Sequence, residues 1–400
     1  MSLYSQLTEE QKTIVKSTIP LLESAGPELT LYFYKRMFRE NPELKNVFNM
    51  SHQTSGAQPF ALFSALAAYA SHIDDISVLT AAVSRIANKH TSLNIQPADY
   101  QIVGHHLIES LRELAPDALT EEVESAWKAA YGALAEVFIN VEEDIYKFNE
   151  EKDNGWRGAK EFRLVEKKIE SELVKSLVFE PTDGNGVADY QAGQYIGIQL
   201  TIPGQENTQI RQYSLSDKSN GDNYRISVKR EIIGTPGIVS NYLHDGLRLG
   251  DTVNLFAPAG DFLLKNQDRP IVLISAGVGI TPMQSIVETL ADKSYDYKVS
   301  FLHACETPDQ HSFKKRIRAL QDKLNLTSHT WYKNDPIDGE NVHHGFMDLS
   351  QIQDELPISD GDFYLCGPVA FMQFAKQQLT TLGIDSDRII YEVFGPHKDF

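Results

Sequence analysis

The chain reads Ser275-Ala-Gly277-Val-Gly279-Ile-Thr-Pro282 between a continuous apolar run at 271–274 and a helical pattern at 283–290. Such a run is typical of a buried parallel strand, so the stretch is a glycine-rich turn from strand to helix. Glycines let a backbone approach an anion closely, and the helix adds free N–H groups and its positive dipole end. Pro282 suits the first helical position. A glycine pair alone is as easily a plain tight turn, but this context favours a phosphate cradle formed by Gly277, Val278, Gly279, Ile280, Thr281 and Pro282.

The C-terminal part continues this alternation of buried strands and helices. Further strands are predicted at 299–302, 329–332, 363–365 and 389–393, with helices between most of them. This order predicts a doubly wound α/β domain over residues 266–400. Two more turns follow its strands, Leu365-Cys366-Gly367-Pro368 and Val393-Phe394-Gly395-Pro396.

The middle of the chain, residues 159–265, has the period-two alternation of short strands separated by Gly, Pro and Asp turns. This pattern predicts an antiparallel, six-stranded β-barrel. One strand carries Arg211-Gln-Tyr213-Ser214, with Arg211 and Tyr213 on one face and Ser214 on the other. An arginine can grip a pyrophosphate and a tyrosine ring can stack on a flavin, although such a tetrapeptide alone is more often an ordinary exposed strand.

A second candidate for diphosphate binding lies downstream in the same region. Gly237-Ile-Val-Ser240 opens a short apolar segment at 239–243, which predicts another helix N-terminus.

Residues 1–148 have helical periodicity and no strand signals, which predicts an all-α domain. Thr8-Glu-Glu-Gln11 is a capping box that opens the first helix, and Gly26-Pro27 is expected to end it. Further helices are predicted from 29 to just before Asn41, and at 59–70, 78–89, 97–114 and 121–146. A polar, glycine-tipped linker at 149–158 then separates this domain from the barrel.

Composition limits the function classes. The 400 residues carry a net charge of −18, which argues against a nucleic-acid partner but says nothing of small anions bound locally. No apolar run approaches the roughly 18 residues needed to cross a bilayer, and the N-terminal sequence lacks signal-peptide features. Two cysteines, Cys305 and Cys366, cannot form a disulfide framework or a structural zinc site. We therefore expect a cytoplasmic protein without a transmembrane segment.

The helical domain offers two candidate sets of metal ligands. His90 falls on the apolar face of its helix, four residues after Ile86, where a lone histidine is most often structural. His105 and His106 are a rival pair, but adjacent helical residues diverge by about 100° and are not expected to share one small site.

The residues around His90 favour it as the metal ligand, because this region resembles a globin. The likeness rests on Leu44-Lys-Asn-Val-Phe48-Asn-Met, Tyr34, Gln58, Leu62 and Lys89-His90-Thr91-Ser92, in globin order and spacing. It implies that His90 is the proximal ligand of the iron of haem b and that Phe48 wedges the porphyrin. It also implies that Tyr34 and Gln58 donate hydrogen bonds to bound oxygen and that Leu62 restricts the distal space.

The globin likeness also assigns Tyr100 and Glu142, which match positions around the proximal histidine. A carboxylate that accepts hydrogen bonds from His90 and Tyr100 would orient the imidazole and make it a stronger electron donor. The alternative is that Glu142 is an ordinary solvated acid within Glu142-Glu-Asp144.

The second half, from about residue 155 to the end, resembles the ferredoxin–NADP reductase superfamily in the order and spacing of its arginine and glycine motifs. The likeness implies a FAD-binding barrel followed by a nicotinamide dinucleotide domain. The implied FAD contacts are Tyr195, Arg211, Gln212, Tyr213 and Ser214, while Gly237 and Ser240 stay candidates for binding a cofactor diphosphate. At the C-terminus the cofactor contacts are Glu392, Val393, Phe394, Gly395 and Pro396, with Phe394 covering the flavin ring. Lys89 and Glu392 match positions close to haem and flavin and are a hypothetical ion pair.

Cofactor preference has its own signal. Glu306 comes just after the predicted strand at 299–302, where its charge would repel a 2′-phosphate. We therefore predict NADH as the preferred form of NAD(P)H.

Taken from end to end, the chain resembles a bacterial flavohemoglobin. The resemblance implies that electrons pass from NADH through FAD to haem iron, and that NO and O2 are converted to nitrate there. The expected protein is a nitric oxide dioxygenase that detoxifies NO, with O2, NO and NAD(P)H as its partners, and a monomer. The alternatives are an O2- or NO-binding sensor or store, another flavohaem enzyme such as an alkylhydroperoxide or ferric reductase, and a haem-free reductase with a helical interaction domain.

Overall fold

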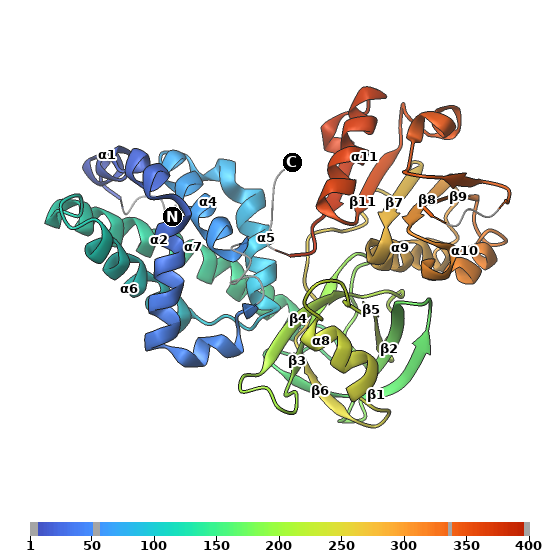
Figure 1. Cartoon of the computed structure of the whole chain (residues 1–400), viewed down its shortest axis with the longest axis horizontal. Helices are drawn as coiled ribbons and strands as arrows, with labels where there is room; N and C mark the ends of the chain where they lie inside the picture. The colour runs from blue at the N-terminus through green and yellow to red at the C-terminus, as the bar shows by residue number, and fades with distance from the viewer. Residues whose placement is uncertain (1–6, 51–56, 335–337, 396–400) are drawn as a thin grey trace. The chain divides into compact units, whose positions relative to one another are not determined.

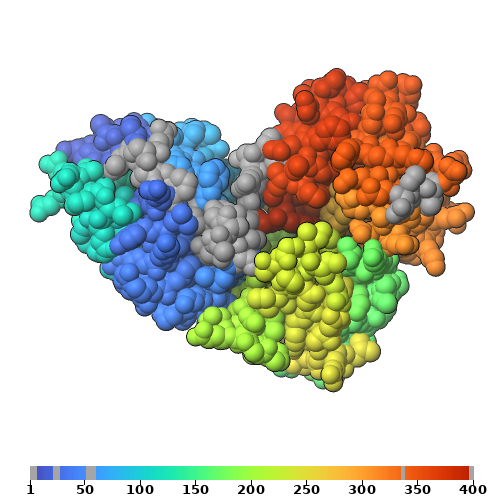
Figure 2. All heavy atoms as spheres, in the orientation of Figure 1, coloured from blue at the N-terminus to red at the C-terminus, as the bar shows by residue number. Residues whose placement is uncertain are grey.

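The computed structural model of the 400-residue chain describes residues 7–50, 57–334 and 338–395, with side chains omitted at 21–27 and 57–59. The chain divides into two compact units (Figure 1). The first contains residues 1–151 with 199–211 and 395–398, and the second contains most of the rest. In Figure 2 the helical residues of the first unit are coloured from blue to teal.

The first unit is a bundle of helices. Its α-helices are α1 (Glu9–Ser17), α2 (Ile19–Glu40), α4 (Ala57–Ser71), α5 (Thr80–Thr91), α6 (Pro97–Leu114) and α7 (Glu121–Glu150). The capping box is confirmed, because Gln11 N donates to Thr8 Oγ1 over 3.1 Å and Thr8 N donates to Gln11 Oε1 over 2.9 Å. These helices of the described residues confirm the predicted all-α part of the fold.

The predicted stop at Gly26-Pro27 is wrong, because α2 runs through these residues. The break lies instead at Thr18, whose hydroxyl donates to the Val15 carbonyl over 2.6 Å. Pro20 then occupies the first turn of α2, where a missing N–H removes no helical hydrogen bond. Local capping therefore places the boundary earlier than the glycine–proline signal.

The middle of the chain forms an antiparallel sheet of six strands, as predicted for the barrel. The strands are β1 (Lys160–Ile169), β2 (Val174–Pro181), β3 (Tyr195–Leu200), β4 (Gln209–Ser214), β5 (Tyr224–Lys229) and β6 (Thr252–Leu255), in the order β4-β3-β6-β1-β2-β5. An antiparallel bridge between Leu215 and Ile226 links the chain after β4 to β5, the other edge strand, which brings the two ends of the sheet together. The short α8 (Ile238–Asn241) lies between β5 and β6.

The C-terminal sheet is parallel, and its strand order is β10-β9-β8-β7-β11-β12. Its elements are β7 (Ile271–Ala276), α9 (Ile280–Asp292), β8 (Val299–Cys305), α10 (Lys314–Leu320), β9 (Leu326–Tyr332), β10 (Val342–His344), β11 (Asp362–Cys366), α11 (Val369–Thr381) and β12 (Ile389–Glu392). Only the three-residue β10 was not predicted. The doubly wound class is confirmed.

Both faces of the parallel sheet are covered, which explains the unbroken apolar runs of its strands. One core joins Ile271 and Leu273 to side chains of α9 and α10, while Val272 and Ile274 pack in the other core with α11. Alternate residues of β7 thus point into different cores. No helix of the described residues is long and apolar enough to cross a bilayer.

Candidate functional site

His90, Tyr100 and Glu142 meet inside the first unit. His90 Nδ1 lies 2.7 Å from Glu142 Oε1 and 2.9 Å from the hydroxyl of Tyr100, which itself donates to the same carboxyl oxygen. Glu142 is 3% exposed and lies inside α7. The solvated-acid alternative for this residue is therefore wrong, because the carboxyl group is buried and holds two partners.

The hydrogen bonds define which nitrogen of His90 is free. Both contacts use Nδ1, so the Nδ1–H donates to the carboxyl group and the lone pair of Nε2 is left for a metal. Burial, followed by the nearby Glu142, raises the pKa of Tyr100, which keeps its hydroxyl protonated as a donor. This donor set fits a haem iron bound at Nε2.

The residues predicted on the distal side lie in the aromatic core of the same unit. The ring of Tyr34 is 6% exposed and stands 5.8 Å from that of Phe48, in an edge-on arrangement. Phe48 and Leu62 are partly buried against this core. The backbone of Gln58 lies in α4, but its side chain is outside the described set.

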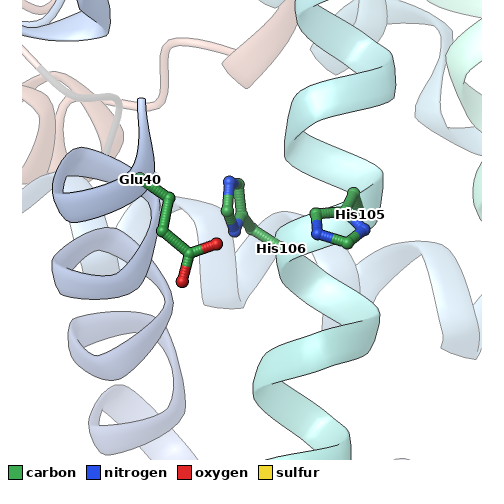
Figure 3. Close-up of side chains that lie close together, drawn as sticks. All are labelled: Glu40, His105 and His106. Carbon is green, nitrogen blue, oxygen red and sulfur yellow. The ribbon is translucent and has the colours of Figure 1, made fainter. Parts of the chain in front are cut away.

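The rival histidines lie closer together than their helical angle predicts. Their rings are 5.1 Å apart between centroids, and ligand atoms of His105, His106 and Glu40 all fall within 4.8 Å of one another. In Figure 3 the ring of His106 lies between Glu40 of α2 and His105. The side-chain conformations of His105 and His106 bring their rings close together, although their backbone directions on the helix diverge.

The chemistry of this cluster nevertheless argues against a metal site. The Nδ1 of His106 contacts the guanidinium of Arg36, and its Nε2 lies 2.8 Å from Asn41 Oδ1, so both ring nitrogens are occupied. Burial and the Arg36 cation lower the pKa of His106. Glu40 forms ion pairs with Arg36 and Arg39. His90 is therefore the better candidate ligand.

The predicted flavin residues lie on neighbouring strands of the barrel. Tyr195 begins β3 and is 7% exposed, while the last four residues of β4 are Arg211, Gln212, Tyr213 and Ser214. Gly260 has φ +119°, and a Cβ there would lie 2.9 Å from the Tyr195 ring, so glycine lets this ring pack closely. Arg211 donates from Nη1 to the Ile210 carbonyl over 2.7 Å, which aligns its guanidinium along the strand.

The second candidate diphosphate site is a closed loop. Gly237 N donates to the Glu231 carbonyl over 3.0 Å, and Glu231 N donates to Ser240 Oγ over 3.2 Å. The segment that follows is only the four-residue α8 continued by one π turn at Tyr242–Gly246. A short helix thus begins just after Gly237, as predicted for this segment, and its role in diphosphate binding stays a prediction.

Glycine is needed for different structural reasons at the two glycine positions of the phosphate cradle, Gly277 and Gly279. Gly277 has φ +54° and open space around the position of a Cβ, as expected where a ligand approaches the backbone. At Gly279 a Cβ would lie 2.2 Å from the carbonyl oxygen of Cys366, so this glycine lets two turns of the protein itself meet. The helix α9 begins at Ile280, and Pro282 is its third residue, not its first as predicted.

The C-terminal segment is described as far as Gly395. Val393 is buried, Phe394 is 45% exposed and Glu392 ends β12. Within the first unit, Lys89 Nζ donates to the carbonyl oxygen of Gly395. Pro396 lies outside the described residues, and the Lys89–Glu392 pair stays a prediction.

The sequence did not predict two residues that contact the Glu306 side chain. Glu306 Oε1 lies 3.1 Å from Lys333 Nζ, and Asn334 Nδ2 donates to Glu306 Oε2 over 3.0 Å. Lys333 and Asn334 directly follow β9, as Glu306 directly follows β8, and these strands are parallel neighbours. The sequence signal that could have predicted this contact is the presence of polar residues just after two adjacent parallel strands.

Comparisons with known proteins match three successive parts of the chain. A globin family model matches residues 31–138, an oxidoreductase FAD-binding domain matches 161–263, and an oxidoreductase NAD-binding domain matches 273–377. A curated flavohemoprotein from Vibrio cholerae serotype O1 is 55% identical over 393 residues, covering 98% of each chain.

Solved structures point the same way. The flavohemoglobin of Malassezia yamatoensis, solved with bound FAD and heme, matches with a TM-score of 0.87 at 27% identity and covers 97% of this chain and 100% of that one. The FAD/NAD-binding domain of nitric oxide dioxygenase from Vibrio cholerae O1 biovar El Tor is 49% identical, with a TM-score of 0.57, over 60% of this chain and 100% of that domain.

The fold and site define a globin joined to a flavin- and nicotinamide-dependent reductase. The chain belongs to the flavohemoglobin family. It is an NAD(P)H oxidoreductase whose cofactors are haem, FAD and a nicotinamide dinucleotide.

Proposed function

We propose that this chain is a nitric oxide dioxygenase that oxidises NO to nitrate with O2, using electrons from NAD(P)H. The observation that carries the proposal is the buried contact of Glu142 with His90 Nδ1. A carboxyl group at this nitrogen makes the imidazole a stronger electron donor, which oxygen activation needs and oxygen storage does not. A reductase on the same chain supports an enzyme that must be re-reduced at every turnover, and disfavours a sensor or store.

The residues of the globin unit would divide the work. Haem, when bound, supplies an iron that takes single electrons and binds the diatomic substrates. His90 would hold it through Nε2, while Glu142 keeps the proton on Nδ1, with Tyr100 as a second donor to the carboxyl group. Tyr34, within the aromatic core, is the candidate hydrogen-bond donor to oxygen, helped by Gln58.

The reductase residues would hold and align two further groups. Arg211, Tyr213 and Ser214 on β4, with Tyr195 on β3, are the proposed FAD contacts. The open turn at Gly277 is the proposed place for the dinucleotide diphosphate. On this view the protein's task is orientation and electrostatics, while the cofactors carry the electrons. We also propose a cytoplasmic monomer, since one chain would contain the whole electron path.

The decisive experiment follows the electrons and the product together. The holoprotein is reduced with NADH without oxygen, then mixed with O2 and NO, while flavin spectra, haem spectra and nitrate are recorded. We expect flavin reduction before haem reduction, and one nitrate for each NO consumed. Haem that is reduced without nitrate formation would instead favour another reductase, such as one for alkylhydroperoxides or ferric iron. A protein without a Soret band would favour the haem-free alternative.

The Glu142→Gln variant tests the carboxyl contact of His90. The amide cannot supply the negative charge that strengthens the imidazole, so we expect a lower iron–histidine stretching frequency and slower NO consumption. Resonance Raman spectra of the ferrous protein give the frequency. Glu143→Gln, one position along α7 and paired with Lys147 at 3.6 Å, is the matched control. An unchanged frequency in Glu142→Gln would refute the proposed role.

The Tyr34→Phe variant tests the distal hydrogen bond. Removing one donor to a polarised ligand should slow NO consumption on the order of tenfold, given the usual value of a hydrogen bond. The NADH-dependent reduction of an artificial acceptor should stay unchanged, because the reductase is intact. Tyr32→Phe removes a hydroxyl that bonds to Glu113 and serves as the control. Full NO turnover by Tyr34→Phe would remove this residue from the mechanism.

A further inference from the structure

Glu306 and Lys333 form an ion pair at the carboxyl edge of the parallel sheet. Their side chains are 52% and 44% exposed, and Oε1 and Nζ are 3.1 Å apart. Asn334 occupies the other carboxyl oxygen at 3.0 Å. The charge of Glu306 is thus already balanced in the folded chain, so simple repulsion of a 2′-phosphate is an incomplete account of cofactor choice.

The position of this pair is fixed by the backbone. Lys333 N donates to the Cys305 carbonyl over 3.1 Å, and Asn334 N donates to the Glu306 carbonyl over 2.8 Å. These bonds continue the pairing of β8 and β9 beyond their last strand residues. Although both charged side chains are exposed, the two Cα positions are therefore held beside each other.

The pair also lies on the edge of the sheet where a dinucleotide is expected. β8 pairs with β7 in parallel, and β7 leads directly into the open turn at Gly277. In open α/β sheets, ligands bind outside the carboxyl ends of the strands. A diphosphate at Gly277 would leave the adenosine half of the dinucleotide to reach along this edge toward the next strand ends, those of β8 and β9.

Lys333 has a second contact that keeps its ammonium group at the edge. Its Nζ lies 5.6 Å from the ring centroid of Phe346, which is 72% exposed. A cation over an aromatic face is attracted by the ring. The lysine is thus held between a carboxylate and a ring and can exchange one anionic partner for another without leaving this position.

We propose that Lys333 determines cofactor selectivity together with Glu306, and this rests on the proposed dinucleotide site. With NADH, the Glu306 carboxylate accepts from the ribose hydroxyls while Lys333 stays paired with it. With NADPH, Lys333 exchanges Glu306 for the 2′-phosphate, whose charge of about −1.5 to −2 makes it the stronger partner. Exposed ion pairs are weak, so this exchange is easy. The chain therefore prefers NADH but accepts NADPH through Lys333.

The test compares two ligands that differ only in the 2′-phosphate, 5′-AMP and 2′,5′-ADP, by calorimetric titration of the holoprotein. Lys333→Met should weaken 2′,5′-ADP by about tenfold, the usual value of one charge-assisted contact. Binding of 5′-AMP should change by less than about twofold, because the ion pair that Lys333→Met removes is exposed and therefore weak. Glu306→Gln should have a different effect. It should strengthen the binding of 2′,5′-ADP and weaken the binding of 5′-AMP.

Matched variants separate this role from a general effect of charge. Lys333→Arg should restore the binding of 2′,5′-ADP, and Lys323→Met, an exposed lysine elsewhere in the same domain, should change neither ligand. The ratio of kcat/KM for NADH to that for NADPH should rise in Lys333→Met and fall in Glu306→Gln. An unchanged ratio of the two dissociation constants in Lys333→Met would overturn the proposal. Because neither ligand involves haem, this outcome is independent of whether nitrate is formed.

Discussion

His90→Ala is expected to produce a protein without a Soret band that still reduces an artificial acceptor with NADH. The side chain supplies the Nε2 lone pair, whereas Glu142 and Tyr100 act on the iron only through that ring. Without the imidazole, the proposed side-chain bond to the iron is lost. Absorption at the Soret band and acceptor reduction, measured on the same preparation, check both halves of the expectation.

The matched control for His90→Ala is His105→Ala. His105 is exposed on α6, so this variant should keep its haem and its NO consumption. Haem retained in His90→Ala would show that another residue ligates the iron. Loss of acceptor reduction as well would mean that the variant is misfolded, and the softer substitution His90→Gln would then replace it in the same two measurements.

Gly279→Ala is expected to disable the dinucleotide domain while leaving haem and flavin bound. Its added Cβ would lie 2.2 Å from the Cys366 carbonyl oxygen and 2.7 Å from Gly367 N, which are backbone atoms. Backbone cannot rotate away as a side chain can, so we expect the free energy of unfolding of this domain to fall by about 3 kcal/mol. Urea unfolding measures this loss, and stopped-flow mixing with NADH should show flavin reduction slowed by orders of magnitude.

Gly277→Ala separates the clash from the loss of a glycine. No atom lies within 4 Å of its added Cβ, and only the left-handed φ of +54° is strained. We expect a loss of about 1 kcal/mol at this position. Equal losses at the two glycines would contradict the close approach of the two turns.

Regular elements followed from the sequence because their signals are local. The apolar run at 271–274 became β7, and the capping box at Thr8 began α1. The helix end predicted at Gly26-Pro27 was wrong because helix ends depend on hydrogen bonds as well as on residue type. The hydrogen bonds of Thr18 set the boundary instead. The three-residue β10 has too few residues to show any periodicity.

The candidate site was less accessible to sequence reasoning, because its contacts join distant residues. The alternative for Glu142, a solvated acid among acidic neighbours, could be rejected only once the burial of α7 was known. Likewise, the effect of the Glu306 charge on cofactor preference was predicted without Lys333, which directly follows the neighbouring strand β9. In both cases the missing information was the set of side chains around a charge.

The order of the strands in the parallel sheet has a consequence for synthesis on the ribosome. β7 lies inside the sheet, and one of its two neighbours, β11, is among the last segments to be translated. The turn at Gly279 meets the turn after β11, so the dinucleotide edge is complete only near the end of translation. The helical unit, drawn almost wholly from the first 151 residues, can form well before this. A nascent chain would therefore have its haem-binding helices before it has any route for electrons to reach them.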